Sequence, residues 1–312
     1  MKYISKAGYV LYKNKLTEED FNKLEEIRKE LTVKPNINPD FCETVSEFKV
    51  YKESEEKMYI PICYGIKYFG LPDKIDFPIL KKMENLEFPL PLRDAQKPAA
   101  IACLNFLNDE KKRRCLLAAT CGFGKTALAL YCICQIKLKT LIIVHKSFLL
   151  NQWIERIKQF IPKAKIGEIR GKTFDIDGKD IVIGMLQSIS MKRFEKNTFN
   201  DFGMVVVDEA HHISSEIFSR ALPKVCSQYM MGLSATPDRK DGLTKVFKWH
   251  LGEIAFSTSG VRDFEVIVNR IFLNSSNQSY CKELLNFKGQ VKMPLMINNI
   301  TSYFKRNKII LA

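Results

Sequence analysis

The sequence predicts an α/β fold in which a parallel sheet is covered by helices on both faces. From about residue 92 onward, continuous apolar runs alternate with helical patterns. The apolar runs are Cys115–Ala119, Leu141–Val144, Ile181–Ile183 and Met204–Val207. Apolar strands separated by helices are typical of a sheet that is buried on both sides, and this favours parallel pairing over antiparallel pairing.

The length of 312 residues suits one large domain or two modest ones. We expect a small N-terminal accessory α+β domain over residues 1–91, because prolines and aromatic residues are frequent from Pro35 to about Pro91. The α/β domain with the parallel sheet is expected over residues 92–256. Residues 257–312 are expected to form a linker, with one more strand over Phe264–Val268.

The accessory domain is expected to begin with a strand, Tyr9–Tyr12, and a helix that Thr17 opens as its N-cap. Asp20 stands three residues after this cap, which is close to a capping box with Asp in place of the usual Glu. Apolar residues then recur at helical spacing and mark one helical face. These residues are Phe21, Leu24, Ile27 and Leu31.

Hydrophobic residues make up 46% of the chain, which is typical of a globular protein. No run approaches the roughly 20 apolar residues that are needed to span a bilayer. The segment Met1–Lys6 also lacks the apolar run and cleavage site of a secretory signal. We therefore expect a soluble, intracellular protein without a membrane partner.

The cysteine pattern and the net charge bear on possible ligands. Nine cysteines are present without any Cys-x-x-Cys pair, and the adjacent His211 and His212 have no thiolate pair to join. We expect reduced structural thiols rather than disulfides or a zinc site. The net charge of +14 favours a polyanionic partner through counterion release, although a basic surface that serves only solubility explains it equally well.

A glycine-rich turn joins an apolar strand to a helix in the sequence Ala119-Thr120-Cys121-Gly122-Phe123-Gly124-Lys125-Thr126. This is the context of a P-loop, whose backbone amides and helix N-terminus bind phosphate. We expect Lys125 to reach the β- and γ-phosphates of ATP, and the Thr126 hydroxyl to bind Mg²⁺. Ala119 replaces the first glycine of the general pattern. The alternative is a turn that only packs tightly, and the Gly-Lys-Thr sequence argues against it.

A second candidate for chemistry follows the buried strand Met204–Val207, in the sequence Asp208-Glu209-Ala210-His211. An Asp at the carboxyl end of a core strand lies beside the P-loop and can hold Mg²⁺ through water. Glu209 is then placed to orient and deprotonate the attacking water as a general base. His211 stands one step further, where the nucleotide state can pass to other motifs. An isolated Asp-Glu pair after a strand is often only a solvated turn, but here a P-loop precedes it.

The order of these motifs resembles that of the superfamily 2 helicases. Gln96 is similar to a Q-like motif, Gly124-Lys125-Thr126 to motif I, Asp208-Glu209-Ala210-His211 to the DEAH box and Ser234-Ala235-Thr236 to motif III. Further short sequence signatures are similar to those of the XPB- and UvsW-like branch and its relatives in large DNA viruses. These signatures are Gln152-Trp153, Gln187-Ser188 and the run from Gly232 to Leu243. The resemblance covers residues 92–256 and implies a RecA-like P-loop domain.

The resemblance implies roles for further residues. Gln96 and Arg93 would read the adenine edge, and Thr120, Cys121, Gly122, Phe123 and Gly124 would surround the phosphates of ATP. Lys146, Gln187 and Ser188 would contact the nucleic-acid backbone. Lys146 is read equally well as a solvated lysine at a helix start, and Met185 stands where many relatives have a Thr. Ser234 and Thr236 would couple hydrolysis to domain movement. Arg239 would belong to a functional turn, with a plain loop charge as its alternative.

A helicase of this type has two RecA-like domains, and the second supplies arginine fingers to the ATP bound at the first. The usual Gln-x-x-Gly-Arg-x-x-Arg run does not occur in these 312 residues. The sequence Tyr303–Ile309 resembles the linker into such a second domain. We therefore expect the chain to be the ATP-binding half of a larger motor, an ATP hydrolase that binds ATP but hydrolyses it poorly alone.

Three functions remain open at this point. The first is an ATP-dependent helicase or translocase that acts on DNA or RNA through backbone contacts. Viral kinship would imply a role in transcription or DNA remodelling, contact with the transcription machinery, and a location in the host cytoplasm and also the virion. The second is an ATP-switched nucleic-acid binding module without motor activity. The third is the ATPase half of a restriction-type translocase, which would need a nuclease signature that residues 1–91 do not show.

Overall fold

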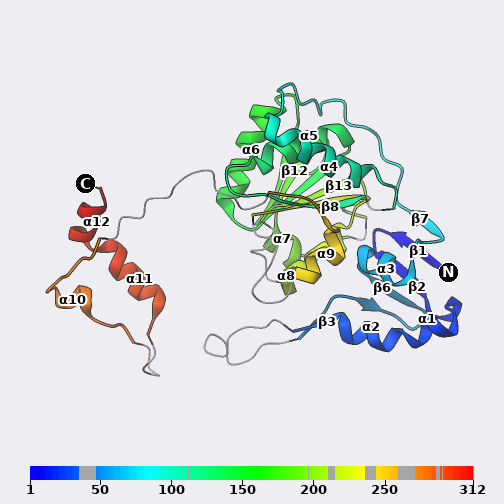
Figure 1. Cartoon of the computed structure of the whole chain (residues 1–312), viewed down its shortest axis with the longest axis horizontal. Helices are drawn as coiled ribbons and strands as arrows, with labels where there is room; N and C mark the ends of the chain where they lie inside the picture. The colour runs from blue at the N-terminus through cyan, green and yellow to red at the C-terminus, as the bar shows by residue number, and fades with distance from the viewer. Residues whose placement is uncertain are drawn as a thin grey trace. The chain divides into compact units, whose positions relative to one another are not determined.

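The computed structural model describes residues 1–34, 47–111, 113–195, 197–209, 215–235, 244–258, 271–285, 289 and 291–311. The chain divides into two compact units, Met1–Gly260 and Val261–Ala312. The first unit contains two larger sheets, one in the predicted accessory region and one in the predicted α/β domain, and a short two-stranded pair (Figure 1).

The larger sheet of the first unit has eight strands in the order β11-β10-β12-β9-β13-β14-β8-β15. The pair β10 and β11 is antiparallel, whereas the other neighbours are parallel. This confirms the predicted α/β fold class. The bounds are β8 Arg114–Ala118, β9 Thr140–Val144, β10 Ile166–Arg170, β11 Thr173–Phe174, β12 Ile181–Met185, β13 Met204–Val207, β14 Tyr229–Ser234 and β15 Ile254–Ser257.

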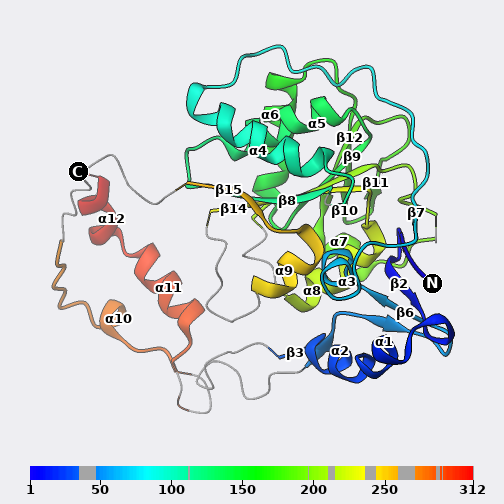
Figure 2. The ribbon, with the colours of Figure 1, turned by 45° about the vertical axis from the view of Figure 1, so that its right-hand side comes forward.

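Helices cover both faces of this sheet, with α4, α5 and α6 on one face and α7, α8 and α9 on the other (Figures 1 and 2). Each face has its own apolar core, so residues that alternate along one strand enter different cores. Val205 and Val207 of β13 belong to one core, and Met204 and Val206 to the other. The bounds are α4 Lys97–Asn108, α5 Lys125–Ile136, α6 Ser147–Phe160, α7 Leu186–Met191, α8 Ser215–Val225 and α9 Thr244–Leu251.

The accessory region contains a second sheet of five strands, in the order β5-β6-β2-β1-β7. The short strands β3 and β4 form a separate antiparallel pair. The strand bounds are β1 Lys2–Ser5, β2 Gly8–Tyr12, β3 Thr32–Val33, β4 Phe48–Lys49, β5 Lys52–Glu53, β6 Lys57–Ile60 and β7 Lys74–Asp76. The helix bounds are η1 Lys13–Lys15, α1 Glu18–Asn22, α2 Leu24–Glu30, α3 Ile62–Phe69 and η3 Asp94–Gln96.

The N-terminal helical segment confirms the predicted cap and shows which residues of the apolar face are buried. The Thr17 Oγ1 accepts a hydrogen bond from the amide of Asp20 at 3.2 Å. Leu24, Ile27 and Leu31 are buried, whereas Phe21 is 54% exposed. At about 100° per residue, Phe21 falls at the edge of the stripe and Asp20 falls within it. Asp20 is buried there and pairs with Lys2 at 2.7 Å.

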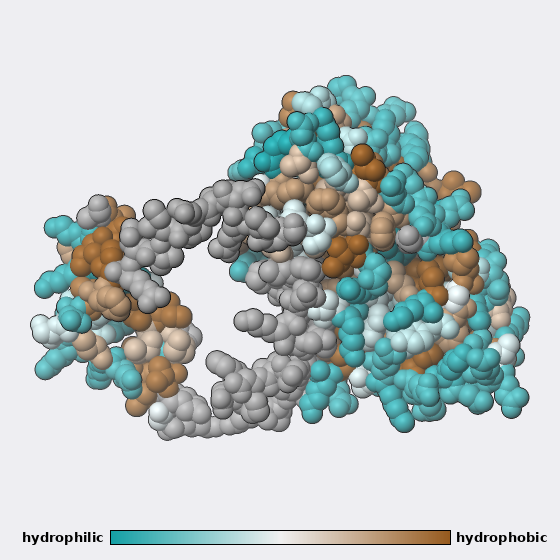
Figure 3. Space-filling view, viewed as in Figure 1, coloured by the Kyte–Doolittle hydropathy of each residue, from teal (hydrophilic) through white to brown (hydrophobic). Residues whose placement is uncertain are grey.

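The accessory region packs against the α/β sheet domain through α3 and the turn between β1 and β2. The ring of Tyr64 in α3 meets the ring of Trp249 in α9 edge-on, with centroids 5.3 Å apart. The ammonium of Lys6 donates to the carbonyl of Phe202 at 3.1 Å. Burial lowers the pKa of Lys6 to about 8. On the face shown in Figure 3, hydrophilic residues cover the outer side of the accessory region.

The second unit contains α10 Gln278–Cys281, α11 Met293–Ser302 and α12 Phe304–Leu311. Several apolar side chains of α11 and α12 are exposed, among them Met293, Ile297, Phe304 and Leu311. The strand predicted over Phe264–Val268 lies outside the described residues, and the linker over residues 257–312 stays a prediction. In the described part of the chain, no helix combines the length and apolar character that crossing a membrane requires.

Candidate nucleotide-binding site

The predicted phosphate loop lies between β8 and α5, and Gly124 is the N-cap of α5. Gly122 and Gly124 have φ angles of +83° and +91°, in the left-handed region that favours glycine. The loop is tied to neighbouring strands by its amides. The amide of Ala119 donates to the carbonyl of Ser234 at 3.0 Å, and the amide of Thr120 donates to Thr258 Oγ1 at 3.1 Å. The loop therefore has a fixed base on the sheet.

Two side chains from the segment before α4 hold the glycine-rich part of the loop. The side-chain Nε2 of Gln96 donates to the carbonyls of Phe123 and Gly124 at 3.0 and 3.4 Å. The guanidinium of Arg93 donates to the carbonyl of Gly122 at 3.2 Å and also to that of Phe123. A Cβ added to Gly124 would lie 2.3 Å from Gln96 Nε2 and 2.8 Å from Arg93 Nη2. Glycine at this position therefore permits both contacts.

These contacts add a supporting role for Gln96 to its predicted contact with adenine, and the two roles can be separated. Gln96→Ala removes the donor to two loop carbonyls, so the affinity for inorganic tripolyphosphate should fall about tenfold. Any additional loss measured with ATP reports the contact with the base. Isothermal titration with both ligands measures the two effects. Unchanged affinity for tripolyphosphate would show that the loop does not need this support.

Lys125 and Thr126 begin α5 directly after the loop. The Lys125 ammonium donates to the carbonyl of Ala119 at 2.8 Å and to that of Thr120 at 3.4 Å. Burial raises the pKa of Asp208, and the positive charge of Lys125 lies near enough to oppose that rise. The phosphate loop and the pair Asp208 and Glu209 thus line one site, as the sequence predicted from the parallel sheet.

One cavity of about 550 Å³ joins these elements. The predicted residues that line it are Arg93, Gln96, Cys121, Gly122, Gly124, Lys125, Thr126, Asp208 and Glu209. Thr120 and Phe123 belong to the loop without lining the cavity, and the Phe123 ring stacks on Phe256 with centroids 6.0 Å apart. Phe123 therefore serves the site through its backbone carbonyl, which Gln96 and Arg93 hold.

Asp208 follows β13 directly and is 7% exposed. Its Oδ2 accepts a hydrogen bond from Trp153 Nε1 at 2.8 Å, and its Oδ1 accepts one from the amide of Glu209 at 2.9 Å. Burial raises the pKa of Asp208, while the Trp153 hydrogen bond and the Lys125 charge oppose that rise. Glu209 has a φ angle of +47°, an unusual conformation for a residue other than glycine. The backbone is thus turned sharply at the residue predicted to be the general base.

Trp153 is a site residue to which the sequence interpretation gave no role. It lies on α6, is 1% exposed and fixes the orientation of the Asp208 carboxylate. The Gln152-Trp153 signature, on which the family resemblance partly rests, is the sequence feature that could have pointed to this residue. Phe88 and Phe160 also line the cavity, and their rings stack with centroids 5.4 Å apart. No motif indicated this pair, because the two residues are far apart in the sequence.

Trp153→Phe should weaken Mg²⁺-dependent nucleotide binding about tenfold, because a hydrogen bond to a charged group is lost while the ring stays buried. The pKa of Asp208 should rise further, since the Trp153 donor favours the ionised form. A carboxyl must be ionised to hold Mg²⁺. When the pH is lowered, the Trp153→Phe variant should therefore lose Mg²⁺-dependent nucleotide binding at a higher pH than the unmodified protein does.

Titration of nucleotide in the presence of Mg²⁺, repeated at several pH values between about 5 and 8, measures this shift. The range lies above the ordinary pKa of an Asp carboxyl, where a carboxyl with a raised pKa titrates. The matched control is Trp249→Phe, which changes a buried tryptophan of α9 outside the cavity. Identical pH profiles for Trp153→Phe and the unmodified protein would contradict the assigned role of the indole.

The residues present fit a nucleotide with its magnesium ion. The glycines leave the loop backbone uncovered, since a Cβ at Gly122 would meet no atom within 4 Å. Lys125 supplies positive charge, and Thr126 and Asp208 supply the oxygen ligands that Mg²⁺ prefers. Among the described residues, no group of three or more His, Cys, Asp or Glu is arranged to hold a metal on its own. Mg²⁺ commonly takes its ligands from one or two carboxylates together with phosphate oxygens and water.

The predicted nucleic-acid contacts lie at the carboxyl ends of the adjacent strands β9 and β12. Lys146 is an exposed N-cap residue of α6. Gln187 Nε2 donates to the carbonyl of His145 at 3.3 Å, and Ser188 Oγ accepts from the amide of Gly171 at 3.1 Å. Gln187 thus lies close to Lys146, because it is bonded to His145, the residue that precedes Lys146.

Ser234 ends β14, is buried and pairs with Ala118, the last residue of β8. It therefore lies beside the strand that leads into the phosphate loop, and its role in coupling stays a prediction. His211, Thr236 and Arg239 lie outside the described residues, and their roles stay predictions.

Comparison with known proteins places this site in context. The family model described as "Type III restriction enzyme, res subunit" matches residues 89–239. The chain is 32% identical over 322 residues to the protein of Acanthamoeba polyphaga mimivirus that is named "Putative ATP-dependent RNA helicase L396". This match covers 99% of the chain and 59% of the mimivirus protein. The chain therefore spans less than two thirds of this relative.

Two further similarities concern the predicted branch. The DNA 3'-5' translocase XPB2 of Sulfurisphaera tokodaii is 32% identical over 187 residues, covering 60% of the chain and 39% of that protein. The crystal structure of the UvsW helicase from bacteriophage T4 superposes with a TM-score of 0.52 at 19% identity. It covers 76% of the chain and 93% of the UvsW chain, and this similarity supports the fold.

Proposed function

Because the chain belongs to the superfamily 2 helicases, we propose that it binds ATP·Mg²⁺ in the cavity around Lys125 and uses the nucleotide to work on nucleic acid. Helicases of this family hydrolyse ATP, and the sequence is similar to the XPB- and UvsW-like branch. The observation that carries the proposal is the convergence of Lys125, Thr126, Asp208 and Glu209 on one cavity.

We assign one role to each of these groups. Lys125 would balance the charge of the β- and γ-phosphates, and the loop amides would donate to the phosphate oxygens. Thr126 and Asp208 would hold Mg²⁺, which neutralises charge on the phosphates when it is bound. Glu209 would orient the attacking water and accept its proton. Trp153 would keep the Asp208 carboxylate in place through the indole hydrogen bond.

The activity of the whole protein is a further proposal, because the chain spans 59% of its mimivirus relative. We propose that full hydrolysis requires a second RecA-like domain whose arginine finger reaches the ATP. Such a finger is worth about 10³–10⁵ in rate. We retain residues 1–91, 92–256 and 257–312 as the proposed accessory domain, ATP-binding domain and linker. A role in transcription or DNA remodelling, in a viral setting, is proposed from the resemblance.

Nucleic acid would be contacted at the carboxyl ends of β9 and β12. The exposed Lys146 and Gln187 lie together there, and the net charge of +14 favours a polyanion. Contacts of this kind are made to the backbone and carry little sequence information.

ATP hydrolysis in a longer chain that contains the second domain should rise when single- or double-stranded DNA or RNA is added. Lys146→Ala combined with Gln187→Ala should reduce this stimulation, because the proposed backbone contacts are lost. Lys23→Ala, at the residue between α1 and α2, is the matched control, since it removes a surface lysine of the accessory region. Steady-state phosphate release, with each nucleic acid titrated in turn, gives the measurement. Equal stimulation of all three proteins would show that the interface lies elsewhere.

The second candidate is the ATPase half of a restriction-type translocase, which the description of the matching family model favours. It predicts cleavage of duplex DNA when ATP is hydrolysed in the longer protein. Translocation without cleavage supports the helicase proposal. Nucleotide-dependent binding of nucleic acid without turnover would instead support an ATP-switched binding module.

A further inference from the structure

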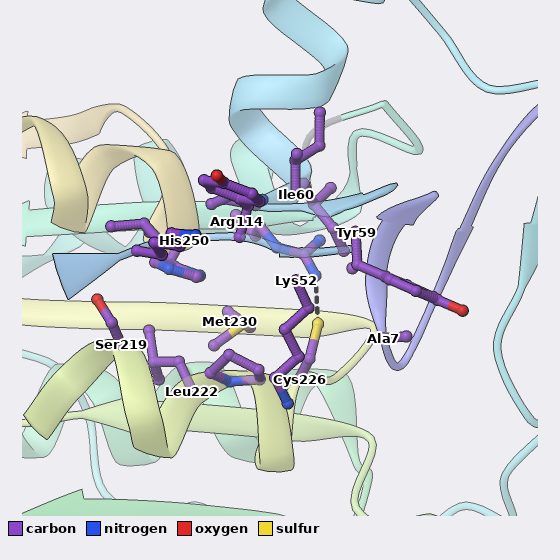
Figure 4. A pocket seen from close by; sticks show the side chains of 17 residues that line it. Ala7, Lys52, Tyr59, Ile60, Arg114, Ser219, Leu222, Cys226, Met230 and His250 are labelled. Atoms are coloured by element: carbon purple, nitrogen blue, oxygen red, sulfur yellow. Dashed lines mark hydrogen bonds between the residues drawn. The ribbon is translucent and has the colours of Figure 1, made fainter. Parts of the chain in front are cut away.

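A second cavity, of about 70 Å³, lies where the accessory region meets the α/β sheet domain. Its lining comes from both parts, with Lys52 and Tyr59 on one side and Arg114, Ser219 and His250 on the other. Figure 4 shows Arg114 and His250 facing the residues Ser219, Leu222 and Cys226 of the α8 segment across this space. The volume exceeds the roughly 10–15 Å³ that a single water molecule needs.

The charge around this cavity is of one sign. Lys49, Lys52 and Arg114 contribute positive groups to its lining, and none of the described lining residues is Asp or Glu. His250 adds no charge at neutral pH, because burial and the Arg114 charge lower its pKa to about 3. Such a cavity favours an anion over a cation.

Arg114 is the group that most needs a partner there. The residue is 3% exposed, and its Nη2 donates to the carbonyl of Ser227 at 2.8 Å and weakly to Cys226 Sγ. Its Nη1 makes one long hydrogen bond of 3.5 Å, to the carbonyl of Gln228. The buried Nε has no hydrogen-bond partner among the described residues. A buried guanidinium without a carboxylate is costly unless other groups compensate its charge.

A second buried donor belongs to another residue of the cavity lining. Ser219 Oγ is buried and has no hydrogen-bond partner among the described atoms. Ser219 lines the cavity from α8, and Arg114 lines it from β8. Ordered water could satisfy both donors, but water would leave the guanidinium charge uncompensated.

We propose that this interface cavity binds a small tetrahedral oxyanion with the chemistry of phosphate, held by Arg114, Ser219 and Lys52. The anion would join the accessory region to the α/β sheet domain, because its ligands come from both. The site is separate from the phosphate loop, which lies at the opposite, carboxyl end of β8.

The test uses the full chain with Lys125→Ala, so that the phosphate loop does not bind the probe. Inorganic phosphate is titrated by calorimetry at constant ionic strength, with sodium chloride as the reference salt. We expect saturable binding of phosphate and a higher thermal unfolding midpoint than in chloride, because a ligand of the folded state stabilises it. Absence of saturable binding would overturn the proposal and leave the cavity to water.

Ser219→Ala and Lys52→Ala, each in the Lys125→Ala protein, locate the bound anion. Each should raise the dissociation constant of phosphate about tenfold, the usual effect of losing a charge-assisted hydrogen bond. Both changes spare the buried Arg114, so the protein should still fold. Lys67→Ala, in an exposed lysine of α3 that does not line the cavity, should leave the constant unchanged. Unchanged binding in both cavity variants would place the anion elsewhere and overturn the proposal.

A final arm distinguishes free phosphate from a phosphodiester of nucleic acid. A short single-stranded oligonucleotide without terminal phosphates is added at saturation before phosphate is titrated. Displacement of phosphate, reduced by Ser219→Ala, would identify the nucleic-acid backbone as the source of the group. Undisturbed phosphate binding would identify the free anion. These results are independent of ATP hydrolysis, so they can hold when the proposed motor function fails.

Discussion

Lys125→Ala is expected to abolish measurable Mg²⁺-dependent binding of ATP, with a loss of affinity of about two to three orders of magnitude. The ammonium lies in the cavity that Thr126, Asp208 and Glu209 also line. Without it, the charge of the bound phosphates would lack its main partner from the protein side. Calorimetric titration with a non-hydrolysable ATP analogue, with and without Mg²⁺, measures the effect.

Two controls make this result specific. Lys163→Ala removes an exposed lysine that pairs with Glu87 and does not line the cavity, and it should bind the analogue normally. The nucleotide-free variants should unfold at the same temperature as the unmodified protein, because among the described residues Lys125 donates only to carbonyls of its own loop. Retention of Mg²⁺-dependent affinity in the folded Lys125→Ala protein would refute the nucleotide site and, with it, the proposed motor.

Glu209→Gln is expected to keep ATP affinity and to lower hydrolysis about 10²–10⁴-fold, the usual contribution of a general base. Glutamine keeps the shape of the side chain but cannot take a proton from water. The reaction should be measured in a longer chain with the second RecA-like domain and nucleic acid, where turnover is fast enough to quantify.

Asp208→Asn separates the two carboxylates. It should weaken Mg²⁺-dependent binding as well as turnover, because Asp208 is proposed to hold the ion. Glu209→Gln should affect the rate alone. If turnover of Glu209→Gln equals that of the unmodified protein, another group accepts the proton and the assignment of the base is incorrect.

Much of the site was predictable because its motifs are local. The phosphate loop follows a continuous apolar strand, and Asp208 follows another. A parallel sheet places the carboxyl ends of its strands along one edge, so the two segments had to be close. The strands predicted at Cys115–Ala119, Leu141–Val144, Ile181–Ile183 and Met204–Val207 agree with β8, β9, β12 and β13 to within a few residues.

Other elements depend on contacts that no local pattern reveals. Strand β10 alternates partly buried and fully buried residues at one side of the sheet, unlike the continuous apolar strands at its centre. Strand β14 contains Gly232, where a Cβ would lie 2.3 Å from Leu116 and 2.8 Å from Leu251. The glycine weakened the strand signal, although close packing against those two leucines requires it. The order of the accessory strands is likewise set by pairing between distant segments, such as β1 with β7.

The supporting contacts of the site were hidden for the same reason. Gln96 holds loop residues 27 and 28 positions away, and Trp153 reaches Asp208 across 55 positions. Phe21 and Asp20 show a limit of hydrophobic spacing, which assigned the phenylalanine to the apolar face of the helix. In the structure Asp20 lies on that face instead, because of the helical rotation per residue, and it is buried in an ion pair with Lys2.

The hydrogen bond between Trp153 and Asp208 also gives the protein an intrinsic optical reporter. Indole emission responds to the charge and hydrogen bonding of its surroundings, and the chain has two tryptophans. With Trp249 changed to phenylalanine, the remaining indole donates directly to the carboxylate proposed to hold the ion. Arrival of magnesium could then be followed in real time by fluorescence, without attaching a dye to the nucleotide or to the polypeptide.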